Sequence, residues 1–359
     1  MCFPTRAWKP VACLIRSGVL RNSGSPLEQA YDVALLDLDG VVYVGAHAVP
    51  GAVEAISTAS AMRFGYVTNN ASRTPGEVAQ HLGELGLTVS ADDVVTSSQA
   101  GARLMLEALG PGRRVLAVGG PGVAEALRAA GMEPVAVEDA GVPEIVDGVL
   151  QGFGRDVGWR HLAQASLAVR DGAHWVATNT DRTFPIPGGL APGNGMMVAA
   201  VAEAAGRPPD AVAGKPYPAL TEESIRRTRA ARPLVVGDRL DTDIEGAERL
   251  GVPSLLVLTG VTDVAALLAA PPGLRPSYLG DDLGALHDAH VAPSADDASL
   301  RWSLGDAAAW IESGRLRVDV PSPKARLDAL RCACAAAWHW TGPLDISAAT
   351  ARLGRRTPG

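Results

Sequence analysis

The feature that most constrains this chain is a regular alternation, from Val33 onward, of short apolar runs with Ala-, Leu- and Arg-rich segments of helical length. Strands that alternate with helices are typical of βαβ units, in which neighbouring strands run parallel. Most of the runs are apolar throughout, as expected for strands that are covered on both faces of their sheet. The expected strands are 33–36, 64–67, 115–118, 145–150, 175–177, 234–236 and 255–258.

The spacing of polar residues after these runs indicates an inserted domain. Asp37 and Thr68 are 31 residues apart, and Lys215 and Asp238 are 23 apart, so each pair suits one βαβ unit. Lys215 lies 147 positions after Thr68, and the segment between them is long enough for a second domain. We therefore predict an α/β fold with a Rossmann-like, doubly wound parallel-sheet core, an inserted α/β domain and a small C-terminal α+β extension. The expected boundaries are a disordered tail (1–27), a discontinuous core (28–99 and 196–287), the inserted domain (100–195) and the extension (288–359).

Composition excludes several classes of protein. The net charge of −7 argues against a general nucleic-acid binder, which would present a basic surface. No apolar run approaches the roughly 18 residues of a membrane-spanning helix. The cysteines are Cys2, Cys13, Cys332 and Cys334, so no disulfide can cross-link residues 14–331, and we expect a cytoplasmic protein. Cys332 and Cys334 lack a second pair and suit the packing of a helix better than a metal site.

Two residue types are rare enough to draw attention to their positions. Of the 32 basic residues 29 are Arg, yet a Lys stands in Gly214-Lys215-Pro216. The chain has five Asn, and two of them, Asn69 and Asn70, are adjacent. In a composition this biased, each exception is a candidate for a chemical role.

Asp37-Leu38-Asp39-Gly40 follows directly on the first apolar run. Two carboxylates at i and i+2 project to the same side if the strand geometry continues, and together they can hold a hard cation and provide a nucleophile. Gly40 allows a tight turn and a close approach of backbone N–H groups to an anion. The alternative is an ordinary Asp-Gly turn at the end of a strand.

Three further polar segments follow predicted strands or precede helices. Thr68, Asn69 and Asn70 offer a hydroxyl and amides suited to phosphate oxygens, the alternative being an Asx turn. Lys215 offers a positive charge, and its alternative is a solvated surface lysine. Asp238 follows a strand and a glycine, where it can bind a metal, whereas acidic residues farther on, such as Asp243, also suit the positive end of a helix.

Taken together, these segments resemble the four motifs of the haloacid dehalogenase superfamily, in the subclass that has a large α/β cap between the second and third motifs. The matching segments are Asp37–Gly40, Val67–Asn70, Gly214–Pro216 and Gly237–Ile244, and the resemblance covers roughly residues 30–287. The C-terminal extension resembles that of the actinobacterial glycerol-3-phosphate phosphatases within this superfamily.

The resemblance implies a phosphatase mechanism with the following roles. Asp37 attacks phosphorus and forms an aspartyl-phosphate, while Asp39 protonates the leaving oxygen and later activates water. Thr68, Asn69 and Lys215 hold the phosphoryl oxygens, with Gly40 and Asn70 as further phosphate- or substrate-binding residues.

The resemblance also implies a Mg²⁺ site. Its ligands are Asp37, the backbone carbonyl of Asp39, and Asp238, while Asp243 orients the ligands without binding the ion itself. The implied substrate is a small phosphorylated metabolite, because a cap over the site excludes large phosphoproteins. No nucleic-acid or membrane partner is expected, and a homodimer is left open.

Several alternatives remain at this point. Glycerol 3-phosphate is the favoured substrate, ahead of phosphoglycolate, sugar or aryl phosphates, and pyridoxal 5′-phosphate, for which Phe184 replaces an expected His. A non-catalytic phosphometabolite-binding protein is a further alternative, although binding alone needs no nucleophile. Val118-Gly119-Gly120-Pro121-Gly122 invites a dinucleotide-binding interpretation, but its glycine spacing is wrong and a turn between strand and helix explains it.

Overall fold

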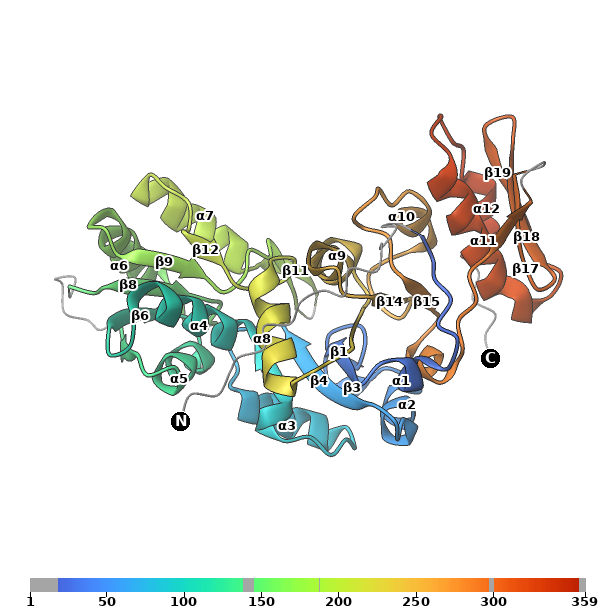
Figure 1. The fold of residues 1–359 in the computed structure, drawn as a ribbon. Coiled ribbons are helices and arrows are strands. Elements are labelled where there is room, and N and C mark those ends of the chain that lie inside the picture. The colour runs from blue at the N-terminus through green and yellow to red at the C-terminus, as the bar shows by residue number, and fades with distance from the viewer. Residues whose placement is uncertain (1–18, 138–144, 187, 297–299, 355–359) are drawn as a thin grey trace. The chain divides into compact units, whose positions relative to one another are not determined.

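The computed structural model describes residues 19–137, 145–186, 188–296 and 300–354 (Figure 1). The chain divides into two compact units, one formed by residues 1–64 and 230–359 and the other by residues 65–229. Each unit contains a parallel β-sheet region with helices, which confirms the predicted α/β class. The predicted domain boundaries stay a prediction.

The strands of the parallel sheet in the first unit lie in the order β15-β14-β13-β1. In the first unit, β1, β13, β14 and β15 pair in parallel, and in the second β4 pairs in parallel with β5. Parallel strands covered on both faces should be buried along their length, and β13 and β14 are buried at every position. The bounds are β1 (Val33–Asp37), β4 (Arg63–Thr68), β5 (Val94–Thr96), β13 (Pro233–Gly237), β14 (Ser254–Val257) and β15 (Tyr278–Gly280).

Short helices and one small hairpin complete the core part of the first unit. They are α1 (Leu27–Ala30), β2 (Tyr43–Val44), β3 (His47–Ala48), α2 (Ala52–Thr58), a π-helical turn (Leu240–Ile244), α9 (Glu245–Leu250), α10 (Val264–Leu268) and a 3₁₀ helix (Leu283–His287). Within the described residues, every helix of the chain is too short or too polar to span a bilayer.

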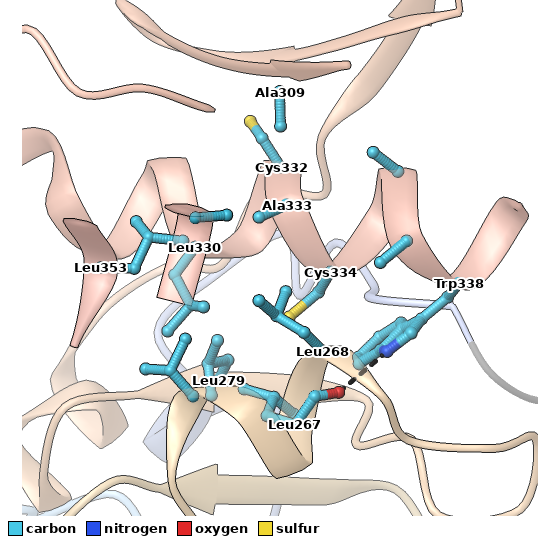
Figure 2. Packing of buried hydrophobic residues seen from close by; sticks show 14 of the residues in the cluster. Leu267, Leu268, Leu279, Ala309, Leu330, Cys332, Ala333, Cys334, Trp338 and Leu353 are labelled. Atoms are coloured by element: carbon cyan, nitrogen blue, oxygen red, sulfur yellow. Dashed lines mark hydrogen bonds between the residues drawn. The ribbon is translucent and has the colours of Figure 1, made fainter. Parts of the chain in front are cut away.

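The C-terminal extension is an antiparallel sheet backed by helix α11, and it shares a hydrophobic core with the sheet of the first unit. Figure 2 shows Leu330, Cys334 and Trp338 of α11 facing Leu267 and Leu268 of α10. The Trp338 indole Nε1 donates to the Leu267 carbonyl at 3.0 Å. The extension is therefore part of the first unit's folded core. Its elements are β16 (Ser294–Asp296), β17 (Arg301–Leu304), β18 (Ala307–Glu312), β19 (Arg315–Asp319), a 3₁₀ helix (Pro323–Ala325), α11 (Arg326–His339) and α12 (Ser347–Leu353).

The two described cysteines lie inside this core. Cys332 and Cys334 are both completely buried on α11. Burial raises the pKa of the Cys332 thiol to about 12. These thiols therefore pack as small apolar groups, as the sequence predicts.

The predicted disordered tail, residues 1–27, differs from the structure in its described part, which begins at residue 19. The Arg21 N–H donates to the Ser277 carbonyl at 3.0 Å, and the Ser23 N–H donates to the His290 carbonyl at 2.9 Å. Leu20 is buried in the same core as α11. Long-range pairing of this kind leaves no pattern in the local sequence, which reads only as polar and Gly/Ser-rich. The rest of the predicted tail lies outside the described residues.

The second unit contains a five-stranded sheet of order β12-β9-β8-β6-β7, in which all neighbouring strands are parallel. Its core contains the fully buried Trp175, surrounded by residues of α6 and α7. The remaining elements are α3 (Pro75–Glu84), a 3₁₀ helix (Ala91–Asp93), α4 (Ser97–Leu109), β6 (Arg114–Val118), α5 (Pro121–Ala129), β7 (Glu133–Val135), β8 (Gly148–Gln151), α6 (Trp159–Arg170), β9 (His174–Ala177), β10 (Thr183–Ile186), β11 (Gly189–Pro192), α7 (Asn194–Ala205), β12 (Ala211–Val212) and α8 (Pro218–Thr228).

The seven predicted strands correspond to β1, β4, β6, β8, β9, β13 and β14. The predicted strand begins three residues too early, because Ile145 is 92% exposed and β8 begins at Gly148. The glycine-rich segment after β6 is the predicted strand-to-helix turn. Gly120 caps α5, and the Gly122 N–H donates to the Ser72 carbonyl at 3.3 Å.

Candidate active site

Three carboxylates of the first unit converge where β1 and β13 end. Asp37 is the last residue of β1, and Asp238 follows β13 directly. In the parallel register Leu36 pairs with Val236, so the two strand ends lie side by side. Within the described residues, carboxylate oxygens of Asp37, Asp238 and Asp243 all lie within 4.8 Å of one another. The structure thus brings together Asp37 and Asp238, as predicted from the sequence.

Close packing fixes Asp238, which is completely buried. Its Oδ2 accepts a hydrogen bond from the Val261 N–H at 2.6 Å. Two glycines make room for this carboxylate. A Cβ on Gly40, whose φ is +89°, would come within 2.8 Å of Asp238 Oδ2, and a Cβ on Gly260 would collide with the same atom. Gly40 is therefore needed both for its backbone conformation and for the space it leaves.

Asp243 is held by the turn that precedes α9. The segment Leu240–Ile244 is a single π-helical turn, a feature often found at functional sites. Within it, Asp243 is 1% exposed, and its Oδ2 accepts from the Arg239 N–H at 3.2 Å. The Asp243 carboxylate thus faces the other two carboxylates instead of lying on the outer surface of a helix. Asp243 does lie in the first turn of this helical segment, as the sequence alternative expects, but its carboxylate also joins the group formed with Asp37 and Asp238.

Asp39 has a different environment from Asp37. Its side chain is exposed, and its backbone lies in a tight turn in which the Gly40 N–H donates to the Tyr43 carbonyl at 2.8 Å. Asp39 and Tyr43 also form an isolated parallel β-bridge through their backbones. Asp39 is outside the three-carboxylate group, so any metal contact from it would come from its backbone, as the family resemblance implies.

Sequence reasoning missed the loop that follows β14. The Thr259 hydroxyl donates to the Gly40 carbonyl at 2.5 Å, and the Thr262 N–H donates to the Asp238 carbonyl at 3.1 Å. This loop therefore holds both the Asp39-Gly40 turn and Asp238. The position of Thr259-Gly260 at the end of a predicted parallel strand was the available clue, because ligands bind along that edge of an open α/β sheet.

The second unit holds the remaining predicted site residues. Thr68 ends β4, is 4% exposed, and its Oγ1 accepts from the Asn70 N–H at 3.0 Å. The Oδ1 of Asn70 accepts from the Ser72 N–H at 2.9 Å and from its hydroxyl at 2.7 Å. This is the Asx turn weighed as the alternative for Asn70. The Thr68 hydroxyl accepts one hydrogen bond and retains a proton that it can donate.

Lys215 is only 6% exposed, which excludes the alternative of a solvated surface lysine. Both of its backbone polar groups contact the Asn69 carboxamide: the Lys215 N–H donates to Oδ1 at 2.8 Å, and the Lys215 carbonyl accepts from Nδ2 at 3.2 Å. Asn69 Nδ2 also donates to Asp181 Oδ2 at 3.2 Å. The structure therefore brings Asn69 and Lys215 together, but through the backbone of Lys215.

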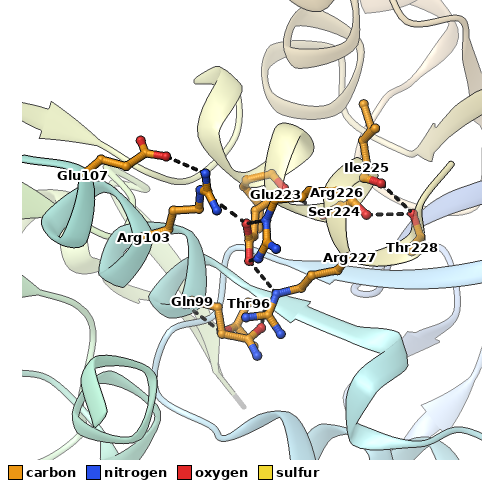
Figure 3. Close-up of polar contacts among 11 residues, drawn as sticks. Thr96, Gln99, Arg103, Glu107, Glu223, Ser224, Ile225, Arg226, Arg227 and Thr228 are labelled. Atoms are coloured by element: carbon orange, nitrogen blue, oxygen red, sulfur yellow. Dashed lines mark hydrogen bonds and ion pairs between the residues drawn. The ribbon is translucent and has the colours of Figure 1, made fainter. Parts of the chain in front are cut away.

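Helix α8, which begins three residues after Lys215, is tied to α4 by a buried carboxylate. Glu223 accepts from Arg226 and Arg227 of its own helix, each at 2.5 Å, and lies 3.9 Å from Arg103 Nε on α4 (Figure 3). Burial by itself raises the pKa of Glu223, but the arginine hydrogen bonds outweigh it, and the pKa lies below its usual value. Glu223 is therefore ionised at neutral pH, and it pairs with two arginines of its own helix and with Arg103 of α4.

The donor set of the first unit fits Mg²⁺. All three converging side chains are carboxylates, and oxygen ligands are those that hard divalent cations prefer. Zinc sites usually include nitrogen or sulfur ligands, and the group contains no His or Cys. Asp238 and Asp243 are buried, whereas Asp37 is partly exposed, so the group is open on the side of Asp37.

Two family models match the chain: a haloacid dehalogenase-like hydrolase model over residues 34–133 and a HAD-hydrolase-like model over residues 212–286. The D-glycerol 3-phosphate phosphatase of Mycobacterium tuberculosis is 44% identical over 315 residues, 87% of each chain. An acid sugar phosphatase of Staphylococcus saprophyticus is 37% identical over 70% of this chain and 95% of its own.

The chain is also similar to solved structures of phosphatases. A glycerol phosphate phosphatase of Mycobacterium tuberculosis in complex with magnesium has a TM-score of 0.80 and 41% identity, covering 93% of this chain and 100% of its own. A 4-nitrophenylphosphatase of Thermotoga maritima has a TM-score of 0.65 and 31% identity, covering 73% of this chain and 97% of its own. The first similarity extends over the C-terminal extension, whereas the second leaves about a quarter of this chain uncovered.

Proposed function

Because the chain belongs to the haloacid dehalogenase-like hydrolase family, we propose that it is a Mg²⁺-dependent phosphatase that hydrolyses glycerol 3-phosphate to glycerol and phosphate. The observation that carries the proposal is the convergence of Asp37, Asp238 and Asp243 where two parallel strands end. Identity of 44% over 87% of the chain to a D-glycerol 3-phosphate phosphatase supports the choice of substrate.

In this mechanism Asp37 is the nucleophile. One of its carboxylate oxygens bonds to phosphorus as the bond from phosphorus to the substrate's ester oxygen breaks. Asp39 donates a proton to that oxygen, so the alcohol leaves neutral. Asp39 then takes a proton from water, whose oxygen attacks phosphorus while the bond to Asp37 breaks and phosphate is released. Asp39 is exposed, and an acid that exchanges protons with both an alcohol and water needs such access.

Asp37, Asp238 and the backbone carbonyl of Asp39 would hold Mg²⁺, with Asp243 orienting them. When bound, the ion neutralises charge on the nucleophile and phosphoryl group that would otherwise repel each other. The loop at Thr259–Thr262 keeps Asp238 and the Asp39-Gly40 turn fixed, so the ligands need little rearrangement.

Lys215 and Thr68 are the proposed ligands of the phosphoryl oxygens, with backbone N–H groups near Gly40 assisting. Lys215 supplies a full positive charge and Thr68 a hydroxyl proton. For Asn69 and Asn70, the proposed phosphate contacts would come from backbone N–H groups, because their side-chain oxygens accept hydrogen bonds from Lys215 and Ser72.

We also propose a cytoplasmic location and the absence of a nucleic-acid partner. The absence of cysteine between residues 14 and 331 supports the location, and the net charge of −7 supports the absence of a nucleic-acid partner. The homodimer remains a prediction, and no feature of the described residues supports it specifically.

The test is a panel of phosphate monoesters assayed with Mg²⁺ and compared by kcat/KM. It contains glycerol 3-phosphate, phosphoglycolate, a hexose phosphate, pyridoxal 5′-phosphate and 4-nitrophenyl phosphate. We expect glycerol 3-phosphate to rank first and the activity to vanish with EDTA. A preference of about tenfold, or 1.4 kcal/mol, for phosphoglycolate would overturn the substrate and keep the phosphatase. Saturable binding without phosphate release would instead support the phosphometabolite-binding protein.

A further inference from the structure

The Asn69 carboxamide forms hydrogen bonds with both the N–H and the carbonyl of Lys215; we call this pair of bonds the bracket. Its Oδ1 accepts from the Lys215 N–H at 2.8 Å and its Nδ2 donates to the Lys215 carbonyl at 3.2 Å. These two groups lie on either side of the Lys215 Cα, so the amide constrains both backbone dihedrals of Lys215. The direction in which the lysine side chain leaves the backbone is set by those dihedrals.

Asp181 accepts the second hydrogen of the Asn69 amide and so reinforces its orientation. An N–H can only donate, so the oxygen of the amide must face Lys215 N, and the Nδ2 hydrogens then need acceptors. The Lys215 carbonyl is one acceptor, and the Asp181 carboxylate, at 3.2 and 3.5 Å, is the other. Both hydrogens of the amide are thereby used, and a carboxylate acceptor makes the bond stronger than a neutral one.

The bracket is supported by two more of the chain's five asparagines. Asn179 Nδ2 donates to the Asn69 carbonyl at 2.8 Å, and Asn179 Oδ1 accepts from the Asp181 N–H at 3.2 Å. Asn194 Nδ2 in turn donates to the Asn179 carbonyl at 2.8 Å. Asn179 and Asn194 are 4% and 2% exposed, so water does not compete for these bonds.

Gly214 allows the amide to approach so closely. A Cβ at this position would lie 2.6 Å from Asn69 Oδ1 and 2.7 Å from the Thr178 carbonyl. Any side chain there would push the amide away from Lys215. The hydrogen bonds between the Asn69 amide and the Lys215 backbone therefore require glycine at position 214.

We infer that Asn69 and Asp181 are positioning residues, which act by fixing the direction of the Lys215 side chain toward the phosphoryl group. The inference rests on the proposed function, in which Lys215 binds that group. It assigns a role to Asp181 and replaces the predicted side-chain contact of Asn69 with phosphate by a contact with the lysine backbone.

The first test is kinetic. Asp181→Ala should lower kcat/KM for glycerol 3-phosphate by about tenfold or more, as for a lost hydrogen bond to a charged group. Asp181→Asn should stay within about threefold of wild type, because its amide oxygen can still accept from Asn69. The exposed Asp171, also in the second unit, gives the matched control Asp171→Ala, which should have no effect. Equal kinetics for Asp181→Ala and wild type would overturn the inference.

A double-mutant cycle separates positioning from an independent structural role. If Asp181 acts through Lys215, adding Asp181→Ala to Lys215→Met should change kcat/KM by less than about twofold. The same loss in both backgrounds would show that Asp181 acts by another route, and the inference would fail.

A spectroscopic test needs no activity. The chain has only three lysines, so protein labelled with ¹³Cε-lysine gives three signals, of which Lys215→Met identifies one. Asp181→Ala should move the Lys215 signal and leave those of Lys9 and Lys324 in place, whereas Asp181→Asn should restore it. An unmoved Lys215 signal would contradict the inference. This result does not depend on turnover. If the wild-type protein had no phosphatase activity, the proposed function would be disproved, but the Lys215 signal would still show whether Asp181 positions Lys215.

Discussion

A charged side chain that is almost completely buried loses its hydration and needs a compensating partner or a ligand. Lys215 is such a residue, at 6% exposure, in a chain that otherwise uses Arg for 29 of its 32 basic residues. Composition alone marked Lys215 as exceptional, and the structure confirms that it is not a solvated surface lysine. In the proposed function, Lys215 binds a phosphoryl group, which carries close to two negative charges at neutral pH.

Lys215→Met should therefore reduce kcat/KM by at least tenfold, because a neutral side chain cannot offset that charge. The corresponding loss of transition-state stabilisation should reach up to several kcal/mol. Steady-state kinetics with Mg²⁺ measures the loss. The exposed Lys324 provides the control Lys324→Met, which should behave as wild type. A loss smaller than tenfold would mean that Lys215 does not contact the phosphoryl group.

At the same scale, the sequence could not reveal how Asn69 is used. Its partner Asp181 is 112 residues away along the chain, and no local spacing records that contact. The carboxylates were easier to predict, because Asp37 and Asp238 each follow an apolar strand and parallel strands end along one edge. Asp243 was harder, since a carboxylate near the start of a helix has an ordinary explanation and only the π-helical turn directs it to the other two.

Among the strands of the parallel sheets, those of four to six residues were predictable and those of two or three residues were not. Strands β5, β12 and β15 have only two or three residues each, too few for a run that stands out from its surroundings. Helix α8 shows a different limit. Its link to α4 through Glu223 depends on Arg103, far away in sequence, so the sequence predicts the helix but not what holds it.

The link predicts a pH-dependent contribution to stability. A carboxylate whose folded pKa is lowered stabilises the fold above its unfolded pKa, and the contribution disappears as the pH falls through the folded pKa. Glu223→Gln should therefore lower the free energy of unfolding by roughly 1.5–3 kcal/mol at pH 7. The difference from wild type should shrink as the pH falls below the usual glutamate value of 4.5.

Urea unfolding at a series of pH values measures this difference. Glu222→Gln is the matched control, because Glu222 is the neighbouring residue on α8 but is exposed. It should change the stability by less than about 0.5 kcal/mol at every pH. A Glu223→Gln penalty that stays constant down to pH 3 would contradict the assignment of the effect to the charge.

On the scale of the whole molecule, the C-terminal extension belongs to the folded core of the first unit. Leu267, Leu268 and Leu279 of that unit pack against α11, and Arg326 of α11 pairs with Asp281. The sequence predicts a small appended α+β extension and leaves its role open. The antiparallel sheet and helix agree with that class, whereas the shared core depends on contacts between distant segments that no local pattern records.

The central claim is that Asp37 is the nucleophile of a Mg²⁺-dependent phosphatase. The most direct test is the release of inorganic phosphate from glycerol 3-phosphate by wild-type protein and by Asp37→Asn, a nearly isosteric change that removes the nucleophilic oxygen. Circular dichroism confirms that both proteins are folded. We predict Mg²⁺-dependent release by wild type that EDTA abolishes, and no measurable release by Asp37→Asn. An active Asp37→Asn variant, or substantial hydrolysis by wild type without metal, would contradict the account.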